Sequence, residues 1–215
     1  MKLLEDLNSQ QREAVTISPG PVLVLAGPGS GKTRVLAHRI AYLVDHFGVQ
    51  PKEIMAMTFT NRAAREMAGR VAQLLDKADA LHPVSKGGVS LGTFHALCAR
   101  LLRRESDLLP VSREFVIFNE SDQHTLVRQA LKEINLDPKQ VQPGKVHGMI
   151  SRAKNELIEL EAFEADTYFA EIARRVYQRY QQLLLSNNAL DFDDLLLWAV
   201  RLFREHDDLL TKYHR

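Results

Sequence analysis

The feature that most constrains the fold of this chain of 215 residues is the octapeptide Ala26-Gly-Pro-Gly-Ser-Gly-Lys-Thr33, which directly follows an apolar run at residues 21–25. Three glycines in it permit the backbone angles that turn N–H groups toward an anion. Lys32 can reach the β- and γ-phosphates, and the Thr33 hydroxyl can ligate Mg²⁺. The alternative is a glycine-rich turn with a surface lysine. The context favours a buried strand, a phosphate-binding loop and a helix, and hence a site for a nucleoside triphosphate.

Composition limits the class of protein. Hydrophobic residues make up 45% of the chain and charged residues 26%, which is typical of a globular protein with one large domain or one domain plus an insertion. The net charge of +1 does not by itself indicate a nucleic-acid partner. The single Cys98 excludes a disulfide within the chain and fits a reducing compartment. Because no apolar run has the length of a signal-peptide core or a membrane span, we expect a cytoplasmic protein without a membrane partner.

Short apolar runs alternate with helical patterns in the first half of the chain. A short capped helix is expected over residues 8–15, and strands are expected at residues 22–26, 54–59 and 89–93. Helical patterns cover residues 32–47, 61–75 and 95–105, while residues 76–88 have the composition of a flexible loop. This alternation predicts parallel βαβ units.

The pattern becomes mostly helical after Pro110. One short extended piece is expected at residues 115–118, followed by a helix that begins near Asn119 or Ser121 and ends near Ile134. Further helices are expected at residues 145–155, 163–186 and 191–205. The sequence therefore predicts an α/β fold in three parts: residues 1–109 begin the nucleotide-binding domain, residues 110–188 form a mostly helical insertion, and residues 189–215 return into the domain.

Three further segments bear on the kind of nucleotide-binding protein. In the first, Gln11 lies about fifteen residues before the loop, and its side-chain amide offers the donor and acceptor that match adenine N6 and N7. The alternative is that Gln11 is an ordinary polar residue on a surface helix.

In the second segment, at residues 57–67, either Thr60 or Asn61 can cap a helix whose free N–H groups suit a phosphate. Phe59 beside it can stack on a base or belong to the core.

The third segment, residues 92–103, repeats the arrangement of the second. A strand end is followed by Thr93, an aromatic residue and His95, and then by a helix that carries Arg100 and Arg103. A lone histidine here can equally be structural. However, open α/β sheets bind ligands at the carboxyl ends of their strands, so two junctions with the same Thr-Phe chemistry indicate a nucleic-acid track.

Taken together, these segments resemble the UvrD/PcrA/Rep family of superfamily 1A DNA helicases. Leu7-Asn-x-x-Gln11 resembles the family's Q motif, and the segment from Gly27 to Arg34 resembles motif I. Thr58-Phe-Thr-Asn-Arg-Ala-Ala-Arg-Glu-Met67 resembles motif Ia, and residues 92–103 resemble motif Ib. Asp191-Phe-Asp-Asp-Leu-Leu196 is similar to the segment that returns from the helical insertion. The resemblance covers essentially the whole chain and implies a RecA-like fold.

The resemblance also implies roles for individual residues. It implies ATP-driven movement along single-stranded DNA and unwinding of duplex DNA, with ATP and Mg²⁺ as cofactors. Lys32 and Thr33 would act in catalysis, with Thr33 on Mg²⁺; Gln11 would read adenine and Arg34 would lie against its ring. The full expected nucleotide site is Gln11, Ala26, Gly27, Pro28, Gly29, Ser30, Gly31, Lys32, Thr33 and Arg34. The expected single-strand track is Phe59, Thr60, Asn61, Thr93, His95 and Phe192.

The chain also departs from the family's pattern. The sequence contains no apolar strand that ends in Asp-Glu, the segment that would hold Mg²⁺ and orient the attacking water. Asp191, Asp193 and Asp194 precede a helix, where capping and the helix dipole account for acidic residues. We therefore expect the N-terminal part of such a helicase, which lacks its second RecA-like domain, binds ATP and single strands weakly and hydrolyses little by itself.

Three other interpretations stay open from the sequence. The chain can be the N-terminal region of a related helicase–nuclease subunit, a non-hydrolysing module that binds nucleotide or DNA, or a small-molecule kinase. Nothing in the sequence resembles the acceptor pocket that a kinase needs. Within the insertion, the segment from Ser151 to Leu157 is a candidate for duplex contact or a solvated helix face.

Overall fold

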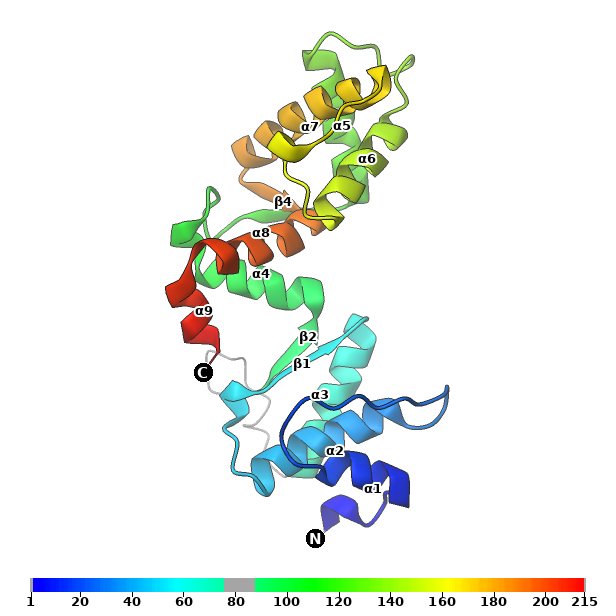
Figure 1. Cartoon of the computed structure of the whole chain (residues 1–215), viewed down its shortest axis with the longest axis vertical. Coiled ribbons are helices and arrows are strands. Elements are labelled where there is room, and N and C mark those ends of the chain that lie inside the picture. Colours follow the sequence, from blue (N-terminus) through cyan, green and yellow to red (C-terminus); the bar gives the residue numbers. More distant parts are fainter. Residues whose placement is uncertain (1, 76–87, 215) are drawn as a thin grey trace. The chain divides into compact units, whose positions relative to one another are not determined.

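A computed structural model describes residues 2–75 and 88–214 of the chain (Figure 1). Contacts divide it into two units, Met1–Leu97 and Cys98–Arg215, and each is described by itself. The division falls within one helix, α4 (Phe94–Arg104). The domain boundaries expected at residues 109/110 and 188/189 remain predictions. The loop expected at residues 76–88 lies outside the described residues except for Gly88.

The described part of unit 1 contains a parallel βαβ unit. Strand β1 (Met55–Thr58) pairs in parallel with β2 (Ser90–Thr93), and helix α3 (Asn61–Leu75) lies between them in sequence. Helices α1 (Ser9–Thr16) and α2 (Lys32–Asp45) precede this unit, with 3₁₀ turns at Lys2–Leu4 and Pro51–Glu53. The core between α2, α3 and the strands is apolar and is formed by Ala37, Ile40, Ile54, Met67, Val71 and Val89.

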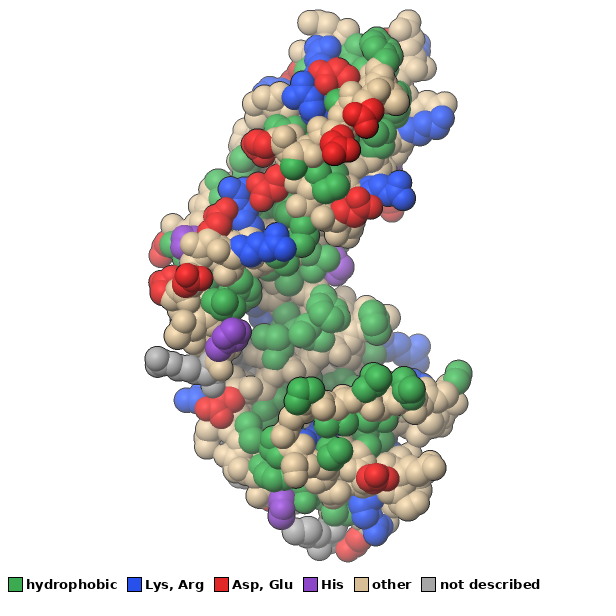
Figure 2. Space-filling view, viewed as in Figure 1, with side chains coloured by type: hydrophobic (Ala, Val, Ile, Leu, Met, Phe, Trp, Pro, Cys, Tyr) green, Lys and Arg blue, Asp and Glu red, His purple; other side chains and the backbone are tan. Residues whose placement is uncertain are grey.

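The strand expected at residues 22–26 does not form, and this prediction is wrong. Among the described residues, this segment pairs with no strand, and the side chains of residues 22–25 are 44–86% exposed. Figure 2 shows hydrophobic side chains gathered on the visible face of unit 1. An apolar run becomes a buried parallel strand only where neighbouring strands and covering helices enclose it. The described part of unit 1 supplies a sheet of two strands, on which Met55 and Met57 are also exposed.

Unit 2 is mostly helical and contains a second parallel strand pair. Strand β3 (Val116–Phe118) pairs with β4 (Ala189–Asp191), so the chain leaves at β3 and returns beside it at β4. Between these strands lie α5 (Glu120–Glu133), α6 (Pro143–Asn155) and α7 (Tyr168–Ser186), with a 3₁₀ turn at Leu160–Ala162. After β4 come α8 (Phe192–Glu205) and α9 (Asp207–Tyr213); a further 3₁₀ turn, Ser106–Leu108, follows α4.

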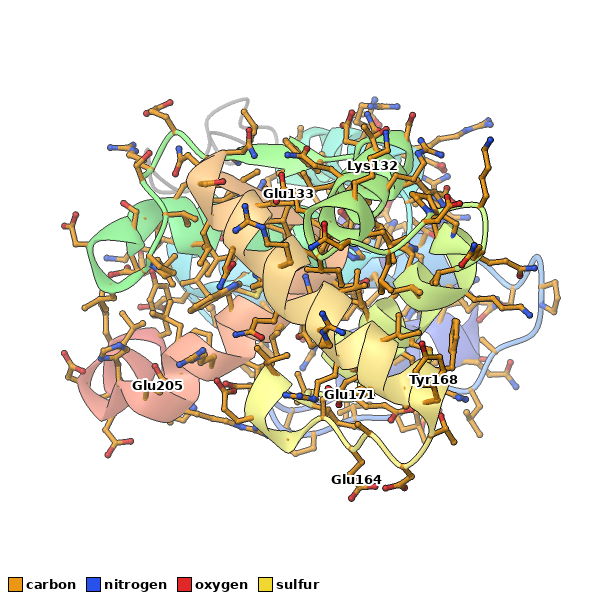
Figure 3. The ribbon with its side chains drawn as sticks, turned by 90° about the horizontal axis from the view of Figure 1, so that it is seen from above. Lys132, Glu133, Glu164, Tyr168, Glu171 and Glu205 are labelled. Atoms are coloured by element: carbon orange, nitrogen blue, oxygen red, sulfur yellow. The ribbon has the colours of Figure 1, made fainter. Side chains whose placement is uncertain are left out.

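Two apolar clusters hold unit 2 together. The first lies between α5, α6 and α7 and is centred on Val127, Ile150, Val176 and Leu184. The second joins the end of α4 to α8 and α9 and includes Leu102, Phe115, Leu195 and Leu202. Figure 3 shows α7 with Tyr168 and Glu171 near its start, and Glu133 at the end of α5. On the surface, Arg179 Nε of α7 donates to Glu133 Oε2 of α5 at 2.5 Å.

The sequence predicted most of these elements to within a few residues, apart from the strand at residues 22–26. The bounds of α3 agree at both ends, and Asn119 rather than Ser121 caps α5. The long helix begins at Tyr168, five residues later than expected, because a 3₁₀ turn and a Thr167 cap precede it. Strand β4 and helix α9 were not predicted. In the described parts of the chain, no helix has the length and apolar character to cross a membrane.

Candidate nucleotide-binding and nucleic-acid site

The loop predicted to bind phosphate leads directly into α2. Gly29 and Gly31 have φ angles of 75° and 84°, a left-handed conformation that glycine adopts without a steric penalty. Gly31 is the N-cap of α2, so the first helical turn starts at Lys32. The Ser30 hydroxyl donates to the Gly27 carbonyl at 2.8 Å and closes the turn. The loop therefore delivers the positive end of the α2 dipole to its own concave side, which suits an anion.

Lys32 is exposed and folds back over this loop. Its Nζ donates to the carbonyl oxygen of Gly27 at 2.6 Å and to that of Ala26 at 3.2 Å. Thr33 follows in the first turn of α2. The ammonium group thus already lies at the loop, and a phosphate has only to exchange those two carbonyl bonds for its own oxygens.

Gln11 ties helix α1 to the same loop. Its Nε2 donates to the Ser30 carbonyl at 2.9 Å, and its Oε1 accepts from the Asn8 backbone N–H at 3.2 Å. The Asn8 side chain in turn accepts from the Gln11 N–H at 2.8 Å, which completes a capping box. The amide predicted to read adenine therefore lies against the loop predicted to bind phosphate.

An open cavity of about 440 Å³ lies beside this loop in unit 1. Its lining residues come from the start of α2 and the second half of α3: Gly31, Arg34, His38, Arg70, Gln73 and Leu74. Arg34, predicted to lie against adenine, donates to the Asp6 carbonyl at 2.7 Å. The volume falls in the range of small-molecule sites, and one face is already formed by residues of the predicted nucleotide site.

Replacing Gly31 with alanine is expected to destabilise unit 1 by about 1–2 kcal/mol, because a side chain at a left-handed φ is strained. The added Cβ would also lie 2.9 Å from Gln11 Nε2. Gly27→Ala is the matched control, since its Cβ would meet nothing within 4 Å. Urea unfolding followed by circular dichroism measures both. Equal stability of the two variants would show that the loop conformation at Gly31 is not fixed.

Strands β1 and β2 lie side by side, and each ends in a threonine that is followed by a phenylalanine. Thr58 and Thr93 are opposite each other in the parallel register, and a phenylalanine follows each. Thr60 Oγ1 accepts from the Ala63 N–H at 3.1 Å and Thr93 Oγ1 from the Ala96 N–H at 3.3 Å, so a threonine caps both α3 and α4. The expected cap of α3 is therefore Thr60, and Asn61 is its first residue.

Phe59 is 95% exposed, which rules out the alternative that it belongs to the core. Phe94 is 46% exposed and follows the paired threonine of the neighbouring strand. Sequence reasoning did not single out Phe94 as a site residue, although the repeated Thr-Phe pair signalled it. Asn61 is exposed and His95 partly exposed, each in the first turn of its helix. Unit 1 thus brings the predicted track residues Phe59, Thr60, Asn61, Thr93 and His95 to one sheet edge.

The remaining predicted track residue, Phe192, belongs to unit 2. It is the first residue of α8 and is 44% exposed. The expectation that Asp191 only precedes a helix needs correction, because Asp191 ends strand β4 and also caps α8. Among the residues the structure describes, no group of three or more acidic, histidine or cysteine side chains could hold a metal ion.

The segment from Ser151 to Leu157 is not a uniformly solvated helix face, and its contact with duplex DNA stays a prediction. Lys154 within it is fully buried and forms ion pairs of 2.7 Å with Asp191 and Asp194. Sequence reasoning missed this residue, and no local pattern marks it, because its partners lie about forty residues away in the chain.

Comparison with known proteins relates the chain to one family. The model of the UvrD/REP helicase N-terminal domain matches residues 7–215. ATP-dependent DNA helicase PcrA of Bacillus subtilis is 45% identical over 216 residues, and its namesakes in Staphylococcus aureus and Staphylococcus epidermidis are 43% and 42% identical. These alignments cover 98–100% of this chain but 28% of each relative. The chain therefore spans somewhat more than a quarter of the length of these relatives.

Proposed function

Since the chain belongs to the UvrD/REP helicase N-terminal domain family, we propose that it binds ATP at the loop of residues 26–33 and single-stranded DNA at the carboxyl ends of β1 and β2. In this proposal it forms the first part of an ATP-dependent DNA helicase that moves on single strands and unwinds duplex DNA. The observation that carries the proposal is the presence, in one unit, of a glycine-rich loop that leads into a helix and of two register-paired Thr-Phe strand ends.

We propose further that unit 1 is part of a RecA-like domain. Its described sheet has two strands, and residues 22–25 expose an apolar run beside the phosphate loop. A RecA-like sheet has more strands than these two, and the relatives extend well beyond the matched part.

Nucleotide binding follows from the loop geometry. The N–H groups at the start of α2 and the loop turn bind the phosphates, and the Lys32 ammonium neutralises the terminal ones. Gln11 and Arg34 lie at the loop and at the adjacent cavity, where the adenine would be held. Gln11 Nε2 donates to the Ser30 carbonyl at 2.9 Å. The side chain that would contact the base therefore also stabilises the conformation of the loop.

Magnesium enters this proposal together with the nucleotide. Thr33 offers one hydroxyl at the start of α2, and the described residues supply no acidic cluster for a metal cage. Mg²⁺ prefers six oxygen ligands and usually keeps several waters and substrate phosphates among them. Thr33 would therefore hold a Mg²⁺ whose other ligands come mainly from ATP and water, and the ion would supply charge neutralisation at the phosphates.

Helix α3 connects the two proposed sites. Its first turn, with Thr60 and Asn61, lies at the DNA end, and its second half, with Arg70 and Gln73, lines the cavity beside the phosphate loop. Because a helix of 15 residues moves as a rigid body, a shift caused by nucleotide at one end is transmitted to the other. We expect ATP binding to change the affinity for single-stranded DNA in this way.

Phe59→Ala is expected to weaken binding of single-stranded DNA by roughly five- to thirty-fold, since stacking of one base on an aromatic ring contributes about 1–2 kcal/mol. The loss of an almost fully exposed side chain leaves the fold intact. Fluorescence anisotropy of a labelled oligothymidine measures the effect. Phe47→Ala is the control, because Phe47 is an exposed aromatic residue of the same unit that packs on Tyr42 and His46. Equal affinities of the two variants would contradict the proposed track.

ATP turnover with and without single-stranded DNA tests the function as a whole, with binding of a fluorescent ATP analogue measured in parallel. The proposal expects magnesium-dependent nucleotide binding, DNA binding and little turnover by these 215 residues alone. Nucleotide binding that DNA does not influence would favour a nucleotide-binding module over a helicase part. Absence of nucleotide binding would overturn the role of the loop.

A further inference from the structure

Unit 2 contains a buried charge cluster that the proposed function does not use. Lys154 of α6 lies between Asp191 and Asp194, with Nζ–oxygen distances of 2.7 Å to each, and all three side chains are at most 2% exposed. The Tyr180 hydroxyl of α7 donates to Asp191 Oδ2 at 2.8 Å. The Lys154 ammonium also lies 5.1 Å from the centre of the Tyr180 ring.

The cluster fixes the first turn of α8. Asp191 Oδ1 accepts from the Asp194 N–H at 2.7 Å, and Asp194 Oδ2 accepts from the Asp191 N–H at 3.3 Å, which forms a capping box. Lys154 binds both carboxylates of this box. A buried ammonium without a partner is very costly, so the two carboxylates hold the end of α6 against the start of α8.

A second contact from α6 lies beside the first. Asn155 Nδ2 donates to Asp193 Oδ1 at 3.0 Å. Phe192 therefore occupies a turn in which the residue before it and the two residues after it are each bound by Lys154 or Asn155. Three side-chain contacts from one helix end restrict the backbone that carries this partly exposed ring.

We propose that Lys154 is a positioning residue that orients Phe192 for base stacking, with Asn155 in support. The inference rests on the proposed binding of single-stranded DNA and extends it to Phe192, the one residue of the expected track that belongs to unit 2. Restricting the backbone before binding lowers the entropy lost when a base stacks on the ring. The helical insertion thereby sets the conformation of a DNA-contacting residue through a buried ion pair.

The test uses two readouts on the purified chain. The first is the ¹⁹F NMR signal of 4-fluorophenylalanine incorporated at position 192, measured without DNA, and the second is affinity for labelled oligothymidine. The main variant is Lys154→Met combined with Asp194→Asn, which keeps the net charge of the cluster, the Asp191 cap and the Tyr180 bond. We expect the ¹⁹F signal to shift toward that of the unfolded chain and DNA affinity to fall about five- to tenfold, with nucleotide affinity unchanged.

Three further variants make the outcome decisive. Asn155→Ala alters an exposed residue, so it preserves the fold, and should shift the ¹⁹F signal and lower affinity about twofold. Lys145→Met removes an exposed positive charge from the same helix and should leave the ¹⁹F signal unchanged. An unchanged ¹⁹F signal in the folded double variant would overturn the role of Lys154. If the double variant fails to fold, an unchanged signal in Asn155→Ala would overturn the proposal that the end of α6 positions Phe192. If Phe192→Ala keeps full DNA affinity, the proposed DNA role of Phe192 fails, whereas the ¹⁹F result still reports on positioning.

Discussion

In the proposed helicase, replacing Lys32 with alanine is expected to lower ATP turnover at least about 100-fold while leaving the fold intact. The ammonium is exposed and donates hydrogen bonds to two carbonyls of its own loop, so its removal costs no core contact. In the proposed site it neutralises charge that builds up on the transferred phosphoryl group. A colorimetric phosphate assay with saturating single-stranded DNA measures the change.

Lys52→Ala is the control for the Lys32 experiment, because Lys52 is an exposed lysine of the same unit in the 3₁₀ turn before β1. We expect this variant to keep the ATP turnover and the unfolding curve of the unaltered protein. If Lys32→Ala kept normal turnover, the loop would not be the site of phosphate chemistry. A shift of the unfolding midpoint in Lys32→Ala would instead mean that its loop bonds stabilise unit 1.

The conformation of the loop at residues 26–33 was largely predictable because it is local in sequence. Gly29, Gly31 and Lys32 are neighbours, and their backbone requirements can be derived from the residue types alone. The same holds for α3, whose cap and apolar face lie within one segment, and whose bounds agree with the expectation at both ends. The residues that determine such features are neighbours in the chain, so a sequence pattern is enough to predict them.

Features that depend on distant partners were not predictable in this way. The apolar run at residues 22–25 has the composition of a buried strand, but a strand needs neighbours, and the described part of unit 1 does not enclose it. The reverse holds for Lys154, which was expected to be exposed and is buried. Its place in a helical pattern next to Arg152 and Asn155 indicated a solvated or DNA-contacting face, whereas carboxylates from β4 and α8 make burial of its charge possible.

Those two carboxylates carry unequal pKa values, although they share one lysine. For Asp194, burial is the largest influence and Asp191 adds to it, so its pKa rises to about 6 despite the nearby ammonium. For Asp191, burial acts in the same direction, but the Lys154 charge and its hydrogen bond prevail and the pKa lies below its usual value. Burial lowers the pKa of Lys154, yet the two carboxylates together raise it. The Lys154 charge thus favours the ionised form of Asp191, whereas burial and the Asp191 charge disfavour the ionised form of Asp194.

Asp191→Ala is therefore expected to lower the free energy of unfolding at pH 7 by about 3–5 kcal/mol, because it leaves buried Lys154 and Tyr180 without their shared partner. The stabilisation by Asp191 is present above its unfolded-state pKa of 3.8 and is lost as the pH falls through its lower folded-state pKa. The deficit of the variant should accordingly shrink in strong acid. Trp198, the single tryptophan of the chain, lies in unit 2 and reports unfolding of that unit in urea.

Asp194→Asn should respond to pH with the opposite sign. Because the folded-state pKa of Asp194 is raised, its contribution is complete below pH 3.8 and is lost as the pH rises through about 6. Relative to the unaltered chain, Asp194→Asn should therefore become more stable between pH 4.5 and pH 7.5. Asp193→Ala, which removes a partly exposed carboxylate between the two, should change stability by less than about 1 kcal/mol at either pH. Parallel pH profiles for Asp191→Ala and Asp194→Asn would mean that Lys154 serves both carboxylates equally.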